Sequence, residues 1–324
     1  MTTAENTLDS VEADEVSTPP TRSKKWLTIL GWSGVTLFFL IFFTLAKLPD
    51  QRIKSYLDSQ IAAQLSPKGI SFSSKSGSIS LLFGLTYTMK DISLNLPPPL
   101  PSGYIDRMDI SPSLIPMLWG KTGGSFSIQN KDGFIQGNFS VSSSQKGDFV
   151  KLSYQAKNLD LGRMGVLPIL AGIQGSGTLS GEGRFAGDLN APNTWDGTIG
   201  LNLSKFVLDS QSIMGFSVPR VGISDSVAEI TFDQGKGKVK SLRLGKPGNS
   251  ADDIHATLSG DLVLGKRMDA STMNLKTNLS LSETVTKAFI LVDALLGPYK
   301  QADGSYTFML SGPLDSPMPG PVAP

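Results

Sequence analysis

The stretch TMNLKTNLSL at residues 272–281 decides the fold, because apolar and polar side chains alternate along most of it. Successive side chains of a strand point to opposite faces, so the pattern predicts a strand with one apolar and one polar face. The same alternation recurs along the chain after Gly69, between turn signals such as Lys131-Asp132-Gly133 and Gln234-Gly235-Lys236. We therefore expect a mainly β protein built from many antiparallel strands in series.

The apolar face of these strands is the candidate binding surface. The residues expected to line it are Ile199, Leu201, Leu203, Leu258, Leu262, Leu264, Leu275, Leu279, Leu281, Phe308 and Leu310. In an ordinary sandwich a second sheet would cover such a face. The chain has few aromatic residues and 34 glycines, which suits a sheet that bends. We therefore expect residues 69–317 to form one elongated, twisted, groove-like antiparallel sheet with a few short helices. Its apolar side would close partly on itself or hold an apolar ligand.

One apolar segment, WLTILGWSGVTLFFLIFFTLA at residues 26–46, has no charged residue and is long enough to cross a bilayer as a single helix. The residues expected to anchor it are Trp26, Trp32, Leu37, Phe38, Phe39, Leu40, Ile41, Phe42 and Phe43. A cleaved signal peptide is the alternative, but no A-x-A-like triplet follows the apolar run. The flanking positive charges balance, so the amino end is taken as cytoplasmic because the whole folded mass follows the span.

The other segments follow from local composition and periodicity. Residues 1–25 are polar and predict a disordered cytoplasmic tail. Residues 47–68 predict a juxtamembrane helix and linker, with apolar residues every four positions from Ile53 to Leu65. The β domain is expected over 69–317 and a disordered tail over 318–324.

Three short helices or turns are expected to interrupt the β domain. They cover Ser111–Gly120, Asp160–Leu170, and a helix capped by Ser282 that stops at Gly297-Pro298. The apolar stripe of the third helix, which includes Val285 and Leu296, favours docking on a sheet face. A sheet-plugging or membrane-touching role is the alternative.

Composition disfavours several classes of function. Lysine and arginine number 29 and aspartate and glutamate 28, which gives no basic footprint for nucleic acid. The chain has no cysteine, and His255 is its one histidine, so thiol chemistry and multi-histidine metal sites are excluded. No Walker or G-x-S-x-G motif occurs, and Asp252-Asp253 fits a solvated turn better than a cation loop. We therefore expect no enzyme activity, no cofactor and no metal site.

Three phrases behind the anchor carry a family resemblance. They are IDRMDISPSLIPMLWGKTGGSFSIQNKDGFIQGNFS at 105–140, GSGTLSGEGRFAGDLNAPNTWDGTIGLNL at 175–203 and SYTFMLSGPLDSPMP at 305–319. They resemble the type II secretion system protein N (GspN) family and the broader AsmA-like group. The resemblance implies a single-pass bacterial inner-membrane protein with its carboxyl domain in the periplasm. It implies an accessory or assembly role in protein secretion, with secretion-system proteins as partners, and offers no catalytic residues.

The AsmA-like side of the resemblance implies an alternative function. In that group a curved β groove has an apolar interior that accommodates phospholipid acyl chains between two membranes. The two alternatives make different demands on the surface. A secretion accessory needs exposed apolar edges that match a protein partner, whereas a lipid carrier needs a continuous concave run of apolar side chains.

Replacing Leu40 with Arg tests the predicted anchor. A charge near the centre of the span should weaken membrane insertion by about 3 kcal/mol on the insertion scale. Fractionation of cells that express the full chain measures the shift from the membrane to the soluble fraction. Unchanged fractionation would contradict the anchor.

Overall fold

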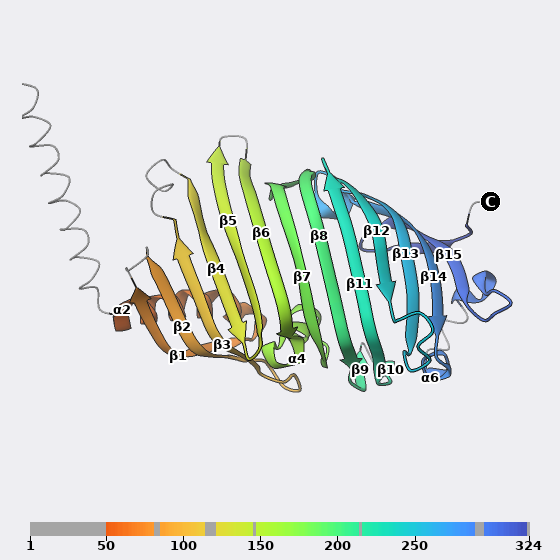
Figure 1. Cartoon of the computed structure of the whole chain (residues 1–324), viewed down its shortest axis with the longest axis horizontal. Helices are drawn as coiled ribbons and strands as arrows, with labels where there is room; N and C mark the ends of the chain where they lie inside the picture. The colour runs from red at the N-terminus through yellow and green to blue at the C-terminus, as the bar shows by residue number, and fades with distance from the viewer. Residues whose placement is uncertain are drawn as a thin grey trace, which may run out of the picture. The chain divides into compact units, whose positions relative to one another are not determined.

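The sheet contains fourteen strands, joined by hydrogen bonds in sequence order apart from a small hairpin (Figure 1). The structure, a computed structural model, describes residues 50–80, 85–113, 121–144, 147–213, 216–288 and 295–322. Every neighbouring pair of strands is antiparallel. The prediction of a mainly β protein with antiparallel strands in series is confirmed, and one sheet takes the place of a sandwich.

The strands, in their order in the sheet, are β1 (Ser71–Ser80), β2 (Thr86–Asn95), β3 (Gly103–Pro112), β4 (Thr122–Asn130), β5 (Gly133–Ser144), β6 (Gly147–Asp160), β7 (Gly175–Asp188), β8 (Ala191–Leu208), β11 (Val221–Asp233), β12 (Lys236–Leu244), β13 (Ile254–Val263), β14 (Thr272–Leu281), β15 (Tyr306–Pro313) and β16 (Met318–Gly320). Strands β9 (Gln211–Ile213) and β10 (Phe216–Val218) pair with each other as a separate hairpin between β8 and β11.

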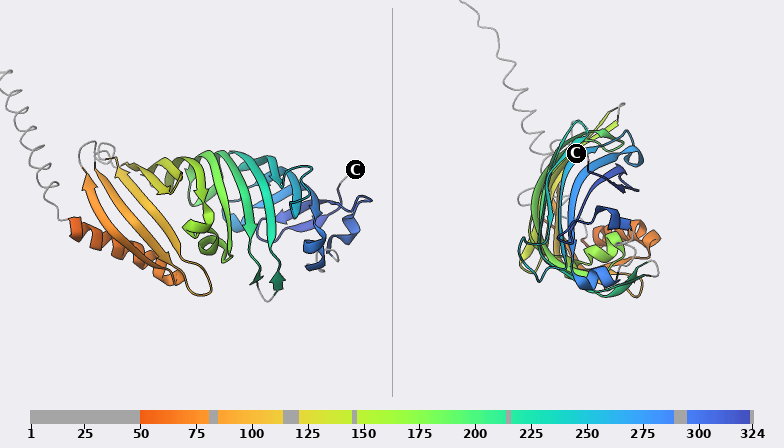
Figure 2. Two further views of the ribbon diagram at one scale, coloured as in Figure 1. Left: turned by 60° about the horizontal axis from the view of Figure 1, so that its bottom comes forward. Right: turned by 90° about the vertical axis from the view of Figure 1, so that its right-hand side faces the viewer.

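Short helices lie on the inner side of the curved sheet, as the two views of Figure 2 show. They are α2 (Asp50–Leu65), α4 (Leu161–Met164), α5 (Val166–Ala171) and α6 (Glu283–Ala288), with single 3₁₀ turns at η1 (Ser66–Lys68), η2 (Met268–Ala270) and η3 (Gly297–Tyr299). Helix α2 packs Leu57 and Ile61 against a cluster built on Met89 of β2. In the same way Met164 of α4 packs on Leu159, and Val285 of α6 packs on Val221 and Ile223.

The helix predictions are largely confirmed. Helix α2 lies within the predicted segment 47–68 and ends at Leu65, the last residue of the apolar spacing. The η1 turn follows it and ends at Gly69, which has a φ of 71°. The side chain of Asp160 caps α4 by accepting a hydrogen bond from the Arg163 N–H. The Ser282 hydroxyl accepts one from the Val285 N–H at the start of α6, and η3 begins at the predicted stop. Helix α6 docks on the sheet through Val285, as its apolar stripe favoured.

Two predicted segments need correction. Ser111 and Pro112 belong to strand β3, because Ser111 pairs with Ser125 and Pro112 with Gly124; residues 114–120 of that predicted helix lie outside the described residues. The tail predicted to be disordered from Met318 begins with β16, whose residues pair with Met309, Leu310 and Ser311 of β15. Neighbouring prolines suggested an unpaired chain, but the exposed edge of β15 supplies hydrogen-bond partners that composition does not reveal.

The predicted tail at 1–25 and the predicted span at 26–46 lie outside the described residues. Within the ranges described above, no helix is both long enough and apolar enough to cross a bilayer.

Residues with a left-handed backbone interrupt the regular alternation of three strands. The register shifts beside Asn158 and Lys205, as in a β-bulge, and is unbroken on both sides of Asp91. Asp91 in β2, Asn158 in β6 and Lys205 in β8 each have a φ of 52°, although none is glycine. At these points the spacing of inward-facing apolar residues changes from two to three, as between Met89 and Ile92 of one buried cluster. Both arms of such a strand therefore keep their apolar side turned inward, and the sheet curves around that side.

Side chains satisfy backbone groups that the bulges and turns remove from the ladder. The Asn158 N–H donates to the Ser180 hydroxyl at 2.9 Å, and the Lys131 N–H donates to the Asp106 carboxylate at 2.5 Å. A backbone donor left without a partner would cost about 1–3 kcal/mol. These hydrogen bonds offset the free-energy cost of interrupting the regular strand pairing.

Glycines opposite aromatic residues allow the rings to lie flat on the sheet. A Cβ on Gly183 would lie 2.5 Å from a ring carbon of Tyr154 and 2.9 Å from the Thr198 carbonyl oxygen. A Cβ on Gly137 would lie 2.7 Å from the Phe126 ring. Gly137 pairs with Phe126 of β4, and Gly183 pairs with Tyr154 of β6, so in each pair the ring and the glycine share one face.

Replacing Gly183 with Ala should destabilise the domain by about 1–3 kcal/mol, because the methyl group overlaps the Tyr154 ring and must displace it. Gly200→Ala is the matched control on the adjacent strand, since its Cβ would meet only the Glu182 carbonyl oxygen at 3.4 Å. Urea denaturation of the full chain measures both changes. Equal effects of the two substitutions would contradict this account of Gly183.

Candidate functional site

An unbroken row of side chains without a charge crosses all fourteen strands on the helix-bearing face. In strand order the row contains Ile79, Tyr87, Ile110, Phe126, Gly137, Tyr154, Gly183, Ile199, Ile230, Val239, Gly260, Leu275, Leu310 and Pro319. Directly paired residues of antiparallel strands present their side chains on the same face. We call this set the middle row.

A second row runs beside the middle row and is equally apolar. It contains Gly77, Met89, Met108, Ile128, Ile135, Ala156, Gly181, Leu201, Ala228, Leu242, Leu258, Thr277 and Phe308. Thr277 is its one polar member; it is buried, and its hydroxyl donates to the Leu275 carbonyl at 3.4 Å. The middle row, the second row and the apolar residues flanking them are called the apolar face below.

The structure brings nine of the eleven predicted groove residues onto this face. Ile199, Leu275 and Leu310 lie in the middle row, and Leu201, Leu258 and Phe308 lie in the second. Leu203 and Leu279 lie on one flank and Leu262 on the other. Leu281 faces Ile254 beside α6, and Leu264 follows the end of β13, where it is buried.

Sequence reasoning missed the half of the face contributed by β2 to β6. Met89, Met108, Ile128 and Ile135 occupy the second row there, and Phe126 and Tyr154 occupy the middle row. The sequence shows the alternation of Phe126 and Ile128 that is typical of a strand. The missing signal was the pairing of aromatic residues with glycines, which joins these strands to the later ones in a single surface.

The middle of the apolar face is only half buried. Ile199, Leu201, Leu203, Leu258 and Leu262 have intermediate exposure, and none belongs to the four buried clusters found in the described part of the chain. The ends are better covered: α2 covers the first strands, and Leu296 with Tyr299 packs on Phe308 of β15. A half-exposed apolar surface of this size is uncommon, which makes the face a candidate binding surface.

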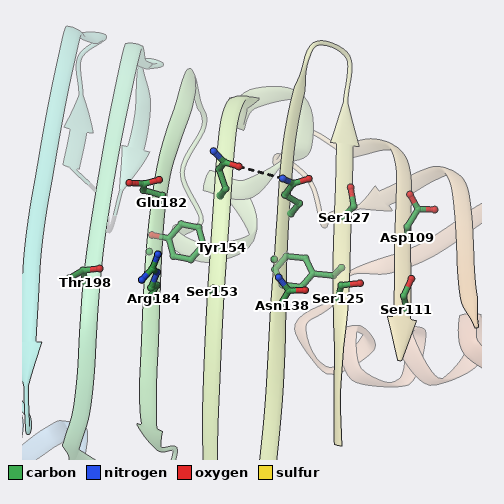
Figure 3. Close-up of a pocket in the computed structure, with 15 residues that line it drawn as sticks. Asp109, Ser111, Ser125, Ser127, Asn138, Ser153, Tyr154, Glu182, Arg184 and Thr198 are labelled. Carbon is green, nitrogen blue, oxygen red and sulfur yellow. Dashed lines mark hydrogen bonds between the residues drawn. The ribbon is translucent and has the colours of Figure 1, made fainter. Parts of the chain in front are cut away.

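The opposite face of the sheet carries a polar groove of about 650 Å³. Figure 3 shows its side chains standing on strands β3 to β8. One wall consists of Asp109, Ser127, Gln136, Gln155 and Glu182, and the other of Ser111, Ser125, Asn138, Ser153, Arg184 and Thr198. Phe126, Gly137, Tyr154 and Gly183 of the middle row form its floor. Burial raises the pKa of Tyr154.

The pair Asp252-Asp253 corrects another prediction, because it is a structural clamp instead of a solvated turn. The Asp252 carboxylate accepts hydrogen bonds from the Ser224 N–H at 2.6 Å, the Ser224 hydroxyl at 2.8 Å and the Lys246 N–H at 2.7 Å. Asp253 accepts from the Gly222 N–H and the Ser282 hydroxyl. These donors occupy the carboxylate oxygens, and no metal-binding group of side chains occurs among the described residues.

His255 lies next to this clamp at the start of β13. It is half buried and lines a small hollow of about 270 Å³ together with Arg243 and Asn278. The Arg243 guanidinium is already paired with Asp225 at 2.6 Å. We find no catalytic arrangement around His255 in the described residues.

Electrostatics make the Asp252 clamp sensitive to pH. Burial by itself raises the pKa of Asp252, but the hydrogen bonds from Lys246 and Ser224, with the nearby His255, hold this pKa below its ordinary value. A carboxylate with a lowered pKa stabilises the fold above its unfolded pKa of about 4, and that stability is lost as the pH falls through the folded value.

Asp252→Asn should therefore destabilise the full chain by about 1–3 kcal/mol at pH 7, since the amide cannot accept all three hydrogen bonds. The difference from the parent protein should shrink as the pH falls below about 4. Urea denaturation at pH 7 and pH 3 tests both statements, with the exposed Asp233→Asn as control. A difference that is independent of pH would show that Asp252 does not act through its charge.

The sequence matches no protein-family model, and neither a curated protein nor a solved structure matches it. The resemblance to the secretion protein N family and the AsmA-like group therefore stays a prediction.

Proposed function

We propose that the Asp50–Pro324 unit binds the hydrocarbon chains of lipids along its apolar face. The observation that carries this proposal is the middle row, which crosses fourteen strands without a charged side chain. Its only hydroxyls are those of Tyr87 and Tyr154. A lipid tail on this surface meets methyl, methylene and ring groups along its whole length.

The dimensions of the face suit long apolar ligands. At about 4.8 Å between neighbouring strands, fourteen strands give a track of about 60 Å. This length is about twice the 30 Å hydrocarbon core of a bilayer. Several acyl chains can therefore lie along the face, and the sheet could carry a lipid well away from a membrane surface.

The energetics favour an occupied face. Burying apolar surface yields about 25 cal/mol per Å², and the half-exposed leucines and isoleucines at the centre of the sheet lack a covering element among the described residues. Backbone groups in this region are paired in the ladder, so a ligand there need not supply hydrogen bonds. An acyl chain would cover these apolar side chains and needs no hydrogen bonds from them.

We also propose that the predicted span at 26–46 holds this unit at the bacterial inner membrane, with the β domain in the periplasm and the apolar face forming a groove for lipid transfer. Strong apolar character without charge supports the span. The accessory role in type II secretion stays a second proposal that rests on the resemblance alone. A protein partner on the same face would support that second role.

Photo-crosslinking in cells tests the lipid proposal with the full chain. The photoreactive residue p-benzoylphenylalanine is placed at Leu201 on the apolar face, or at its neighbour Asn202, which is exposed on the polar face. Cells are labelled with radioactive phosphate and irradiated, and the purified protein is examined for labelled lipid. We expect a phospholipid adduct at Leu201 and at least tenfold less at Asn202.

The outcomes separate the two proposed roles. Equal labelling at the two positions, or no lipid at Leu201 in the folded protein, would overturn lipid binding. A protein-sized adduct at Leu201 without lipid would favour the secretion role. Ile199 and Thr198 form a second matched pair, since they alternate in the same way on β8.

A further inference from the structure

We propose that the polar groove on the outer face binds a linear, neutral oligosaccharide chain. This site lies on the opposite side of the sheet from the apolar face, so the inference goes beyond lipid binding. The groove extends across β3 to β8, about 25 Å at 4.8 Å per strand. An extended chain of several sugar units fits such a length.

The walls of the groove offer many hydrogen-bonding groups with no partner in the described part of the chain. Asn138, Glu182 and Arg184 form no side-chain hydrogen bond with another described residue, and neither do Ser127, Ser153 and Thr198. Figure 3 shows these groups on both sides of the groove, with one weak contact of 3.4 Å between Gln136 and Gln155. Hydroxyl, amide and carboxylate groups at this density match the donors and acceptors of vicinal sugar hydroxyls.

The charges of the groove select a neutral ligand. The Asp109 carboxylate accepts from the Thr88 hydroxyl at 2.5 Å and from the Arg107 side chain at 2.8 Å, so its charge is compensated. Glu182 and Arg184 lie two residues apart on β7, one on each wall, and their opposite charges balance. A phosphate-rich or strongly cationic ligand gains nothing from this balance.

A peptide strand fits the groove less well. Strand addition needs a free sheet edge, but β4 to β7 are each paired on both sides, so their backbone groups are already used. Tight protein partners also insert aromatic or aliphatic anchors into apolar pockets. The walls here are hydroxyls, amides and charged groups, which favour a polyhydroxylated chain.

Isothermal titration of the full chain tests the proposal. The probes are three unbranched hexasaccharides: α1,4-linked glucose, β1,4-linked glucose and β1,4-linked N-acetylglucosamine. We expect at least one to bind, and Asn138→Ala and Gln155→Ala each to weaken that binding at least tenfold. Both side chains are exposed, so the fold should tolerate their loss. Asn278→Ala, an exposed amide on the same face of β14, is the matched control and should leave binding unchanged.

Each other outcome contradicts the proposal. No binding of the three hexasaccharides at millimolar concentration would overturn it, as would an equal loss in the Asn278→Ala control. Binding of an extended polar peptide that competes with the sugars would assign the groove to a protein ligand instead. The lipid crosslink at Leu201 is read on the opposite face, so the two proposals can fail independently.

Discussion

The backbone ladder that runs through fourteen strands is the constraint on which the other features depend. Because every strand is antiparallel to its neighbours, paired residues align in rows across the sheet. A row gathers residues that lie far apart in the sequence, such as Phe126, Ile199 and Leu275. The apolar face is therefore a property of register as much as of composition.

Curvature gives the two faces different environments. The left-handed residues Asp91, Asn158 and Lys205 let both arms of a strand turn apolar residues inward, and short helices cover part of that inner side. The same curvature leaves the polar rows outward, where they flank a groove with the middle-row backbone as its floor. One sheet thus presents two surfaces of opposite chemistry, separated by the thickness of a single backbone layer.

Small residues and buried carboxylates allow the irregular features. Glycine opposite Phe126 and Tyr154 lets large rings lie on the sheet without pushing strands apart. Asp252 and Asp253 connect β11, the turn after β12 and the start of α6 through five hydrogen bonds. These contacts hold the end of the sheet where α6 docks, and they would be costly to leave unmade.

The sequence by itself determined the strand class, the helix within residues 47–68 and the apolar alternation of the later strands, because two- and four-residue periodicities are local properties of the chain. Only the tertiary structure decided the register that joins Phe126 to Gly137 and Tyr154 to Gly183, the donors that occupy Asp252, and the strand formed by Met318–Gly320. The polar groove also emerged only there, since its two walls come from six strands. Each of these features depends on pairing between distant residues, and local alternation specifies which face a side chain takes but not which neighbour it meets.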